Sequence, residues 1–236
     1  MSSCWKRHLI RLRFTHQFVL LSFVLLIGCS EHQDSTSSPQ GIDVSHYQGD
    51  IDWQKVSSQK LQFVFIKATQ GNQYVDPHYQ QNWQQSAQYD LLRGIYHYLD
   101  PSIDAVAQAK HFVNISKGQF GDFPPVIDIE AFENEKASKV INVLQEFIMY
   151  IEQHVSCKPI IYTSHGFWDQ LNNHQFGDYP LWLADYASKP QLPNGWQQWT
   201  FWQFESNANI PGIPNQVDKN KYNGTEHQLR QLRCAK

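Results

Sequence analysis

Short apolar runs alternate with longer amphipathic segments from residue 41 to about residue 175. The apolar runs are bounded by Gly, Pro, Asn or Asp, which is typical of buried strands separated by turns. This pattern predicts strands at 41–45, 62–68, 92–98, 125–129, 159–162, 180–184 and 200–204, with Val217-Asp218 at the end of a final short strand. It predicts helices at 52–59, 77–89, 103–117, 131–153 and 166–172.

Strands that alternate with helices of this size indicate βαβ units and a parallel sheet. Beyond residue 175 the predicted strands follow one another with loops between them. We therefore predict an α/β fold, a modified TIM-like (β/α) barrel of about five β/α units followed by strands with little helix. A chain of 236 residues is long enough for such a barrel as one domain.

The N-terminal segment has the pattern of an export signal. Basic residues at 6, 7, 11 and 13 precede an apolar stretch at 18–27, which ends in Leu26-Ile27-Gly28-Cys29. That ending resembles a bacterial lipobox, in which the cysteine is lipidated. We predict a lipoprotein signal peptide at 1–28, a flexible tether at 29–40 and a globular domain at 41–236. An uncleaved membrane anchor and a cleavage site without lipid remain open alternatives.

Each of these readings places the domain outside the cytoplasm. We expect a protein of the cell envelope, attached by a lipid on Cys29 to the outer membrane or to a periplasm-facing membrane surface. The signal removes four Lys or Arg and no Asp or Glu, so the rest is more acidic than the whole chain, whose net charge is −3. An acidic domain is a poor ligand for phosphate backbones, and we expect no nucleic-acid partner.

Two further cysteines, Cys157 and Cys234, lie in the predicted domain. Outside the cytoplasm they could form a disulfide, although their separation in space does not follow from the sequence, and free thiols remain the alternative. They lack the spacing of a zinc site. The histidines also lack the i, i+4 spacing of a zinc-binding helix, and we expect neither a metal nor another cofactor.

Polar residues follow the apolar runs at the predicted strand ends. In a barrel the carboxyl ends of parallel strands converge on one face, where active sites are built. The residues at these ends are Asp43, Lys67, His97, Asp128, Glu130, Asp185, Gln203 and Asp218.

Asp128 and Glu130 form the most informative pair. Residues i and i+2 of a strand point to the same side, with Cα atoms roughly 6.5–7 Å apart. Two neighbouring carboxylates repel, so one of them keeps its proton to higher pH. A protonated acid beside an ionised partner is what cleavage of a glycosidic bond requires. The tripeptide alone is more typical of a solvated loop than of a site, but its place after Val126-Ile127 favours a site.

Eight motifs occur in order between about residues 41 and 224. They are GIDVSHYQ (41–48), FIKATQG (65–71), GIYHY (94–98), PVIDIE (125–130), IYT (161–163), LWLA (181–184), FWQ (201–203) and VD (217–218). Together, and in this order, they resemble the glycoside hydrolase family 25 lysozymes, the Chalaropsis-type muramidases.

The resemblance implies a modified (β/α) barrel with an acidic groove that hydrolyses the β-1,4 bond between N-acetylmuramic acid and N-acetylglucosamine in peptidoglycan strands. Glu130 corresponds to the general acid. Asp128 corresponds to a companion carboxylate that orients the substrate's acetamido group or assists attack. Asp43 and Asp218 correspond to the other two groove acids. We expect a monomer whose substrate-binding residues are Lys67, Tyr96, His97, Tyr162, Trp182, Trp202 and Gln203, with His97 more a hydrogen-bonding support than a base.

One departure concerns Gln70, because the family often has an acid at that position. All four groove acids are present, which favours an enzyme over the competing interpretation, a non-catalytic glycan-binding lipoprotein on the same fold. The sequence leaves open whether cleavage retains or inverts the anomeric configuration. It also leaves open whether the protein remodels its own wall, attacks competitors or recycles fragments.

Overall fold

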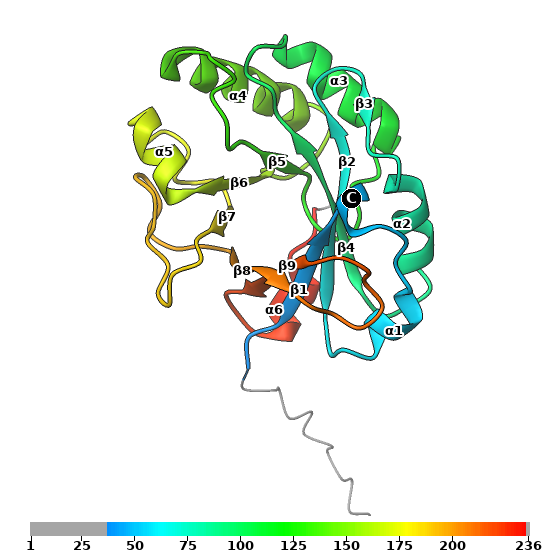
Figure 1. Cartoon of the computed structure of the whole chain (residues 1–236). Helices are drawn as coiled ribbons and strands as arrows, with labels where there is room; N and C mark the ends of the chain where they lie inside the picture. The colour runs from blue at the N-terminus through cyan, green and yellow to red at the C-terminus, as the bar shows by residue number, and fades with distance from the viewer. Residues whose placement is uncertain (1–36, 235–236) are drawn as a thin grey trace, which may run out of the picture. The chain divides into compact units, whose positions relative to one another are not determined.

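The computed structural model describes residues 37–234. Cys29, the predicted signal peptide and most of the tether lie outside the described residues. The strands, shown in Figure 1, are β1 (Gln40–Val44), β2 (Phe63–Gln70), β3 (Tyr74–Val75), β4 (Leu92–Tyr98), β5 (Val126–Asp128), β6 (Ile160–Ser164), β7 (Leu181–Ala184), β8 (Phe201–Ala208) and β9 (Val217–Tyr222). The helices are η1 (His46–Gln48), α1 (Trp53–Ser57), α2 (Tyr79–Ser86), α3 (Ala105–Ser116), α4 (Ala137–Glu152), α5 (His165–Leu171) and α6 (Glu226–Gln231).

The strands close into a barrel, which confirms the predicted fold class. The sheet order is β1-β9-β8-β7-β6-β5-β4-β2-β3, and a direct pairing of β1 with β2 closes the ring. Strand β3 extends β2 outside the ring as an antiparallel partner. From β1 through β2, β4, β5, β6 and β7 to β8, neighbouring strands are parallel, so their carboxyl ends meet at one mouth.

Strand β9 runs against both of its neighbours, and this corrects the predicted position of Asp218 at a strand's end. Val217 begins β9, and the strand continues to Tyr222 antiparallel to β1 and β8. Because the strand is reversed, its first residues lie at the mouth. Asp218 therefore reaches the same end of the barrel as Asp43 near the end of β1 and Asp128 at the end of β5.

Helices α1 to α4 cover the outside of the strands in the first part of the barrel, and little helix accompanies β7, β8 and β9 (Figure 1). Helix α4 begins at Ala137, later than the predicted start at 131. Glu133 and Asn134 have left-handed backbone angles, with φ of 47° and 66°, which a helix does not allow. The short strand β3 and the C-terminal helix α6 were not predicted.

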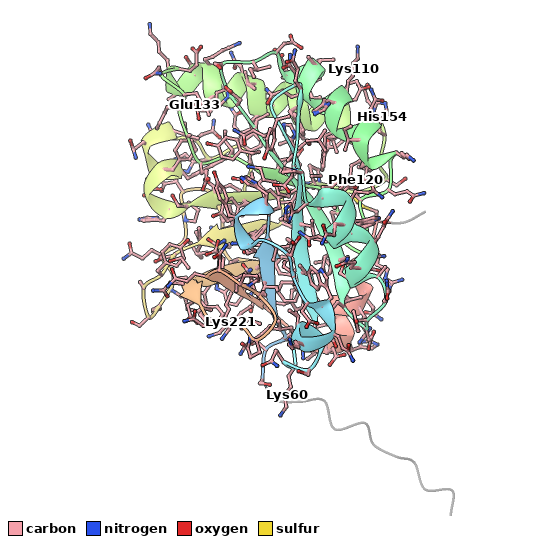
Figure 2. All side chains as sticks on the ribbon, turned by 45° about the vertical axis from the view of Figure 1, so that its right-hand side comes forward. Lys60, Lys110, Phe120, Glu133, His154 and Lys221 are labelled. Carbon is pink, nitrogen blue, oxygen red and sulfur yellow. A yellow bond between two sulfur atoms is a disulfide. The ribbon has the colours of Figure 1, made fainter. Side chains whose placement is uncertain are left out.

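Apolar side chains form two layers, one on each side of the barrel wall. Figure 2 shows the side chains on the ribbon, which fill the space between the helices and the strands. The outer layer packs the strands against the helices. The inner layer is largely aromatic, and Phe65 stacks on Trp182 with ring centroids 4.4 Å apart. Aromatic rings bury large areas and have few rotatable bonds. These side chains therefore form a rigid apolar core inside the barrel, below its mouth.

A disulfide joins Cys157, in the loop before β6, to Cys234, after α6, with the Cα atoms 5.1 Å apart. This resolves the alternative that the sequence left open. Within residues 37–234, helices of the length and apolarity needed to cross a membrane are absent.

Candidate active site

A cavity of about 110 Å³ opens at the mouth of the barrel, and we call it the acid cavity. Four carboxylic acids and four of the predicted substrate-binding residues line it. They are Asp43, Tyr96, Asp128, Glu130, Tyr162, Trp182, Gln203 and Asp218. The structure thus brings together residues from seven strands and from the loop that follows β5.

Strand pairing brings Asp43 and Asp218 together. They are direct cross-strand partners in the antiparallel pair β1–β9. Like charges directly opposite each other destabilise a sheet, so this pair needs either a shared proton or strong hydrogen-bond donors.

Two side-chain amides donate hydrogen bonds to Asp43. Its Oδ2 atom accepts a hydrogen bond from Asn220 Nδ2 at 2.7 Å and another from Gln203 Nε2 at 3.0 Å. Asn220 is fixed in turn, because its Oδ1 atom accepts from Trp182 Nε1 at 2.7 Å. Asp43 is therefore held by a chain of buried amides whose orientation is set by the indole of Trp182.

Gln203 is the centre of this network. Its Oε1 atom accepts from the hydroxyls of Tyr162 at 3.0 Å and Tyr186 at 2.7 Å. Its Nε2 atom donates to Asp43 and, at 3.3 Å, to Asp218 Oδ2. One buried amide thus connects both acids with both tyrosines across the mouth.

Burial raises the pKa of both acids in this pair. For Asp43 the pKa lies well above its usual range, because burial and the charge of Asp218 outweigh the donors Asn220 and Gln203. For Asp218 burial raises the pKa to about 6, although its hydrogen bond with Asp43 opposes the rise. Because the two carboxyl groups face each other across the strand pair, the charge state of each affects the titration of the other.

Asp128 ends β5 and Glu130 follows two residues later, while Ile129 between them packs into the outer apolar layer. The alternation of a strand thus continues past its end. Burial raises the pKa of Asp128 well above its usual range, and the charge of Glu130 adds to this. Burial also raises the pKa of Glu130, against the opposing charge of Lys67. Asp128 Oδ1 is buried without a hydrogen-bond partner among the described residues.

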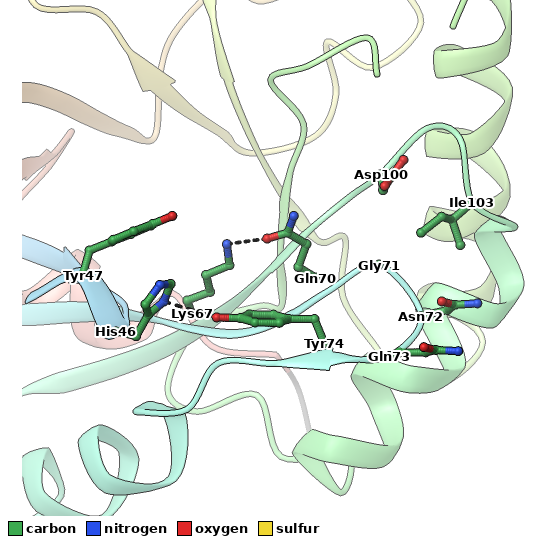
Figure 3. Close-up of a pocket in the computed structure, with 10 residues that line it drawn as sticks. All are labelled: His46, Tyr47, Lys67, Gln70, Gly71, Asn72, Gln73, Tyr74, Asp100 and Ile103. Carbon is green, nitrogen blue, oxygen red and sulfur yellow. Dashed lines mark hydrogen bonds between the residues drawn. The ribbon is translucent and has the colours of Figure 1, made fainter. Parts of the chain in front are cut away.

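Two larger cavities flank the acid cavity. One, of about 410 Å³, shares Glu130 and Tyr162 with it and extends over Ser164, Asp185 and Tyr186. The other, of about 490 Å³, is lined by Lys67 and by residues before β3 and after β4, and we call it the Lys67 cavity. Figure 3 shows this cavity, into which Lys67 points from β2. A polymer lying across the mouth would therefore find space on both sides of the acids.

Comparison with known proteins identifies the family of this chain. The sequence profile described as "Glycosyl hydrolases family 25" matches residues 42–213. The chain belongs to glycosyl hydrolase family 25. It is a glycoside hydrolase of the lysozyme type. The family assignment therefore decides for the enzyme and against the other interpretation of the sequence, a non-catalytic glycan-binding lipoprotein.

Named relatives agree with this family 25 assignment. The chain is 37% identical to "Uncharacterized protein YegX" of Escherichia coli O157:H7, over 84% of this chain and 75% of that protein. It is 33% identical to "Lysozyme M1" of Streptomyces globisporus, over 84% of this chain and 72% of that protein. The crystal structure of a bacterial lysozyme from Streptomyces coelicolor superposes with a TM-score of 0.77 at 30% identity, covering 84% of this chain and 98% of that one.

Besides Lys67, which lines its own cavity, three of the residues singled out from the sequence lie outside the acid cavity of this family 25 enzyme. His97 points outward from β4, where it meets Thr69 Oγ1 at 2.8 Å and Gln108 Oε1 at 3.3 Å. Burial lowers the pKa of His97 to about 3, so the ring is neutral and supports the wall. Trp202 lies on the outer side of β8, and its Nε1 atom donates to the backbone oxygen of Asp185.

Asp185 accepts from the backbone nitrogens of Ala187 and Gln191 and so shapes the loop after β7. Asn220 and Tyr186 were not predicted from the sequence, and their hydrogen bonds place them at the site. Alternation along β9 would have put Asn220 on the same side as Asp218. Among the described residues, groups of three His, Cys, Asp or Glu that could hold a metal ion are absent.

Proposed function

We propose that this chain is a peptidoglycan muramidase. It hydrolyses the β-1,4 bond between N-acetylmuramic acid and N-acetylglucosamine, with Glu130 as the general acid and Asp128 assisting. The observation that carries the proposal is the convergence of four carboxylic acids in one cavity at the barrel mouth, with open cavities on either side for a glycan strand.

Glu130 has the position that a proton donor needs. It lines both the acid cavity and the 410 Å³ cavity, so a glycosidic oxygen at their junction would lie beside its carboxyl group. Burial raises the pKa of Glu130, which keeps the proton available at higher pH than for an exposed glutamate. Donation of this proton to the leaving oxygen breaks the glycosidic bond.

Asp128 lies deeper than Glu130 and has an acceptor atom to offer. Its buried Oδ1 atom has no partner among the described residues, and buried acceptors normally have one. The N–H of a substrate acetamido group can donate to this atom and so fix the sugar against the acids. The same carboxylate can also assist attack at the anomeric carbon.

Asp43 and Asp218 supply negative charge on the other side of the cavity. The amides of Gln203 and Asn220 hold this charge in place before substrate arrives. A preorganised negative site stabilises the positive, oxocarbenium-like sugar that forms as the bond breaks. These two acids therefore act by electrostatics, while Glu130 transfers the proton.

The decisive experiment compares wild type with Glu130→Gln on purified peptidoglycan. We expect Glu130→Gln to lose release of reducing sugar by at least about a hundredfold while it remains folded by circular dichroism. Glu146→Gln, an equal change on an exposed face of α4, is the control and should keep full activity. Wild-type activity in Glu130→Gln would refute the assigned acid.

Mass spectrometry of the products tests the reaction itself. Fragments that end in reducing N-acetylmuramic acid are the expected result. Anhydro ends would show a lytic transglycosylase instead, and reducing N-acetylglucosamine ends would show that the other glycosidic bond is cut.

We also propose that Cys29 carries the lipid that holds the enzyme at the cell envelope. The support is the lipobox-like Leu26-Ile27-Gly28-Cys29, which precedes the described residues. Cys29→Ala should move the protein from the membrane fraction to the soluble fraction of fractionated cells. Unchanged membrane association would favour an uncleaved helix.

A further inference from the structure

The ammonium group of Lys67 is buried and only partly satisfied. The residue is 8% exposed, and its Nζ atom donates to Gln70 Oε1 at 2.8 Å. The rings of Tyr74 and Tyr98 lie 5.9 and 5.1 Å from Nζ. No carboxylate of the described residues lies within 4.0 Å of it. An ammonium group has three N–H donors, so Lys67 has donors left for a ligand.

These remaining donors meet the Lys67 cavity. Figure 3 shows the ammonium group of Lys67 beside Gln70, with Tyr47 and Tyr74 bordering the same space. Two other ionisable groups that line the cavity already have partners. His46 Nδ1 lies 2.8 Å from Asp76 Oδ2, and Asp100 accepts from the backbone nitrogen and hydroxyl of Ser102.

Gln70 determines how much of the lysine's charge is available. A glutamate at this position would pair with Lys67 and cancel its charge. The neutral amide supplies a hydrogen bond and fixes the side chain, but it leaves the positive charge uncompensated within contact distance. Burial in a partly apolar wall also strengthens the attraction of this charge for an anion.

We propose that the Lys67 cavity binds a carboxylate on the lactyl-peptide branch of a muramic acid residue, with the carboxylate at Lys67 Nζ. The inference rests on the proposed function, because it assumes a muropeptide substrate. Lys67 lies on β2 and Asp128 on β5, and only β4 separates these two strands in the sheet. Burial lowers the pKa of Lys67, and the charges of Asp128 and Glu130 oppose this fall. A substituent of a sugar bound over these acids therefore lies near the lysine. An ammonium–carboxylate contact is charge-assisted and thus stronger than a neutral hydrogen bond.

The first test is calorimetric binding of small muramic acid ligands to the whole enzyme, which needs no cleavage. The probes are N-acetylmuramic acid, whose lactyl carboxylate is free, and muramyl dipeptide, whose free carboxylate is on the peptide. Each is paired with its carboxamide. We expect about tenfold tighter binding of the carboxylate over its carboxamide for the branch that reaches Lys67. The ligand that shows this difference identifies the source of the carboxylate.

Gln70→Glu is the informative variant, because it adds a competing carboxylate while conserving shape. It should weaken binding of the preferred carboxylate about tenfold and leave binding of the carboxamide unchanged. Gln145→Glu adds the same charge on an exposed part of α4 and should change neither. Equal binding of carboxylates and carboxamides by wild type, or equal weakening of both in Gln70→Glu, would overturn the proposal.

Kinetics separate this inference from the proposed function. On peptidoglycan the KM of Gln70→Glu should rise for the native polymer and not for polymer whose carboxylates have been converted to amides. If wild type cleaves both polymers with equal KM, the carboxylate site is refuted and the muramidase activity is not. Carboxylate-dependent binding without any cleavage would refute the muramidase and leave the binding site standing.

Discussion

Gln203 Nε2 donates to Asp43 Oδ2 across 3.0 Å, although the two residues are 160 positions apart in the sequence. Strands β1 and β8, which lie on either side of β9 in the closed ring, meet through this bond. The Gln203 amide therefore links the closure of the barrel to the positions of its acids. Loss of this amide should disturb both the stability of the barrel and the geometry of the site.

Gln203→Met tests this coupling, because methionine has a similar length and lacks the amide. Both acids lose a donor, and Tyr162 and Tyr186 lose their acceptor. We expect a loss of about 2–3 kcal/mol in the free energy of unfolding and a fall in kcat of at least about tenfold. Urea unfolding and turnover measure the two effects. Gln145→Met is the exposed control, and an effect of similar size there would refute the coupling.

Asp218 makes stability depend on pH. Because burial raises its pKa to about 6 in the folded state, the folded chain binds a proton that the unfolded chain releases above about pH 4. Its contribution to stability therefore falls as pH rises from about 4 through about 6. Asp218→Asn should be more stable than wild type at pH 7, on the order of 1–2 kcal/mol after allowance for its partial exposure. The difference in stability between Asp218→Asn and wild type should vanish at pH 4. A difference in melting temperature that is the same at pH 4 and at pH 7 would contradict this.

Lys67 lowers the pKa of both Asp128 and Glu130, against the larger effect of burial. Lys67→Met removes this charge and should raise both pKa values. The alkaline limb of the kcat–pH profile should then move to higher pH, because the acid keeps its proton longer. Lys139→Met, on an exposed part of α4, should leave the profile in place. An unmoved alkaline limb in Lys67→Met would show that the ammonium does not control the acid pair.

The disulfide between Cys157 and Cys234 links positions 77 residues apart. A cross-link of this span restricts the unfolded chain, so Cys157→Ser should lower the free energy of unfolding by about 2–4 kcal/mol. Denaturant unfolding of the variant and of the reduced wild type should give similar losses. Activity below the unfolding transition should persist, since neither cysteine lines the acid cavity. Full stability after reduction would contradict a structural role.

The parallel part of the barrel was predictable because each of its strands is a compact apolar run with turn residues around it. β9 escaped full prediction because Lys219 and Lys221 alternate with Asp218 and Asn220, which leaves few apolar residues. Asn220 is fully buried all the same, because it bonds to Asp43 and Trp182. Partners so distant in the sequence give no local signal.

The site was predictable to the extent that it depends on strand ends. The rule that side chains at carboxyl ends converge brought in Asp43, Asp128, Gln203 and Asp218, although Asp218 reaches the mouth because it lies near the start of the reversed strand β9. The same rule does not say which side of a strand a residue faces. His97 and Trp202 follow apolar runs, yet they alternate outward, next to inward-facing Tyr96 and Gln203.

The reversed direction of β9 has a consequence for how this enzyme can diversify. The hairpin loop at 209–216 emerges on the mouth side, where Asn215 Nδ2 donates to the backbone oxygen of Tyr47, beside the Lys67 cavity. Insertions or deletions in this loop would reshape one wall of the groove and leave the strands intact. The hairpin loop is therefore the segment in which sequence changes can alter the selectivity of the enzyme for chemically different cell walls.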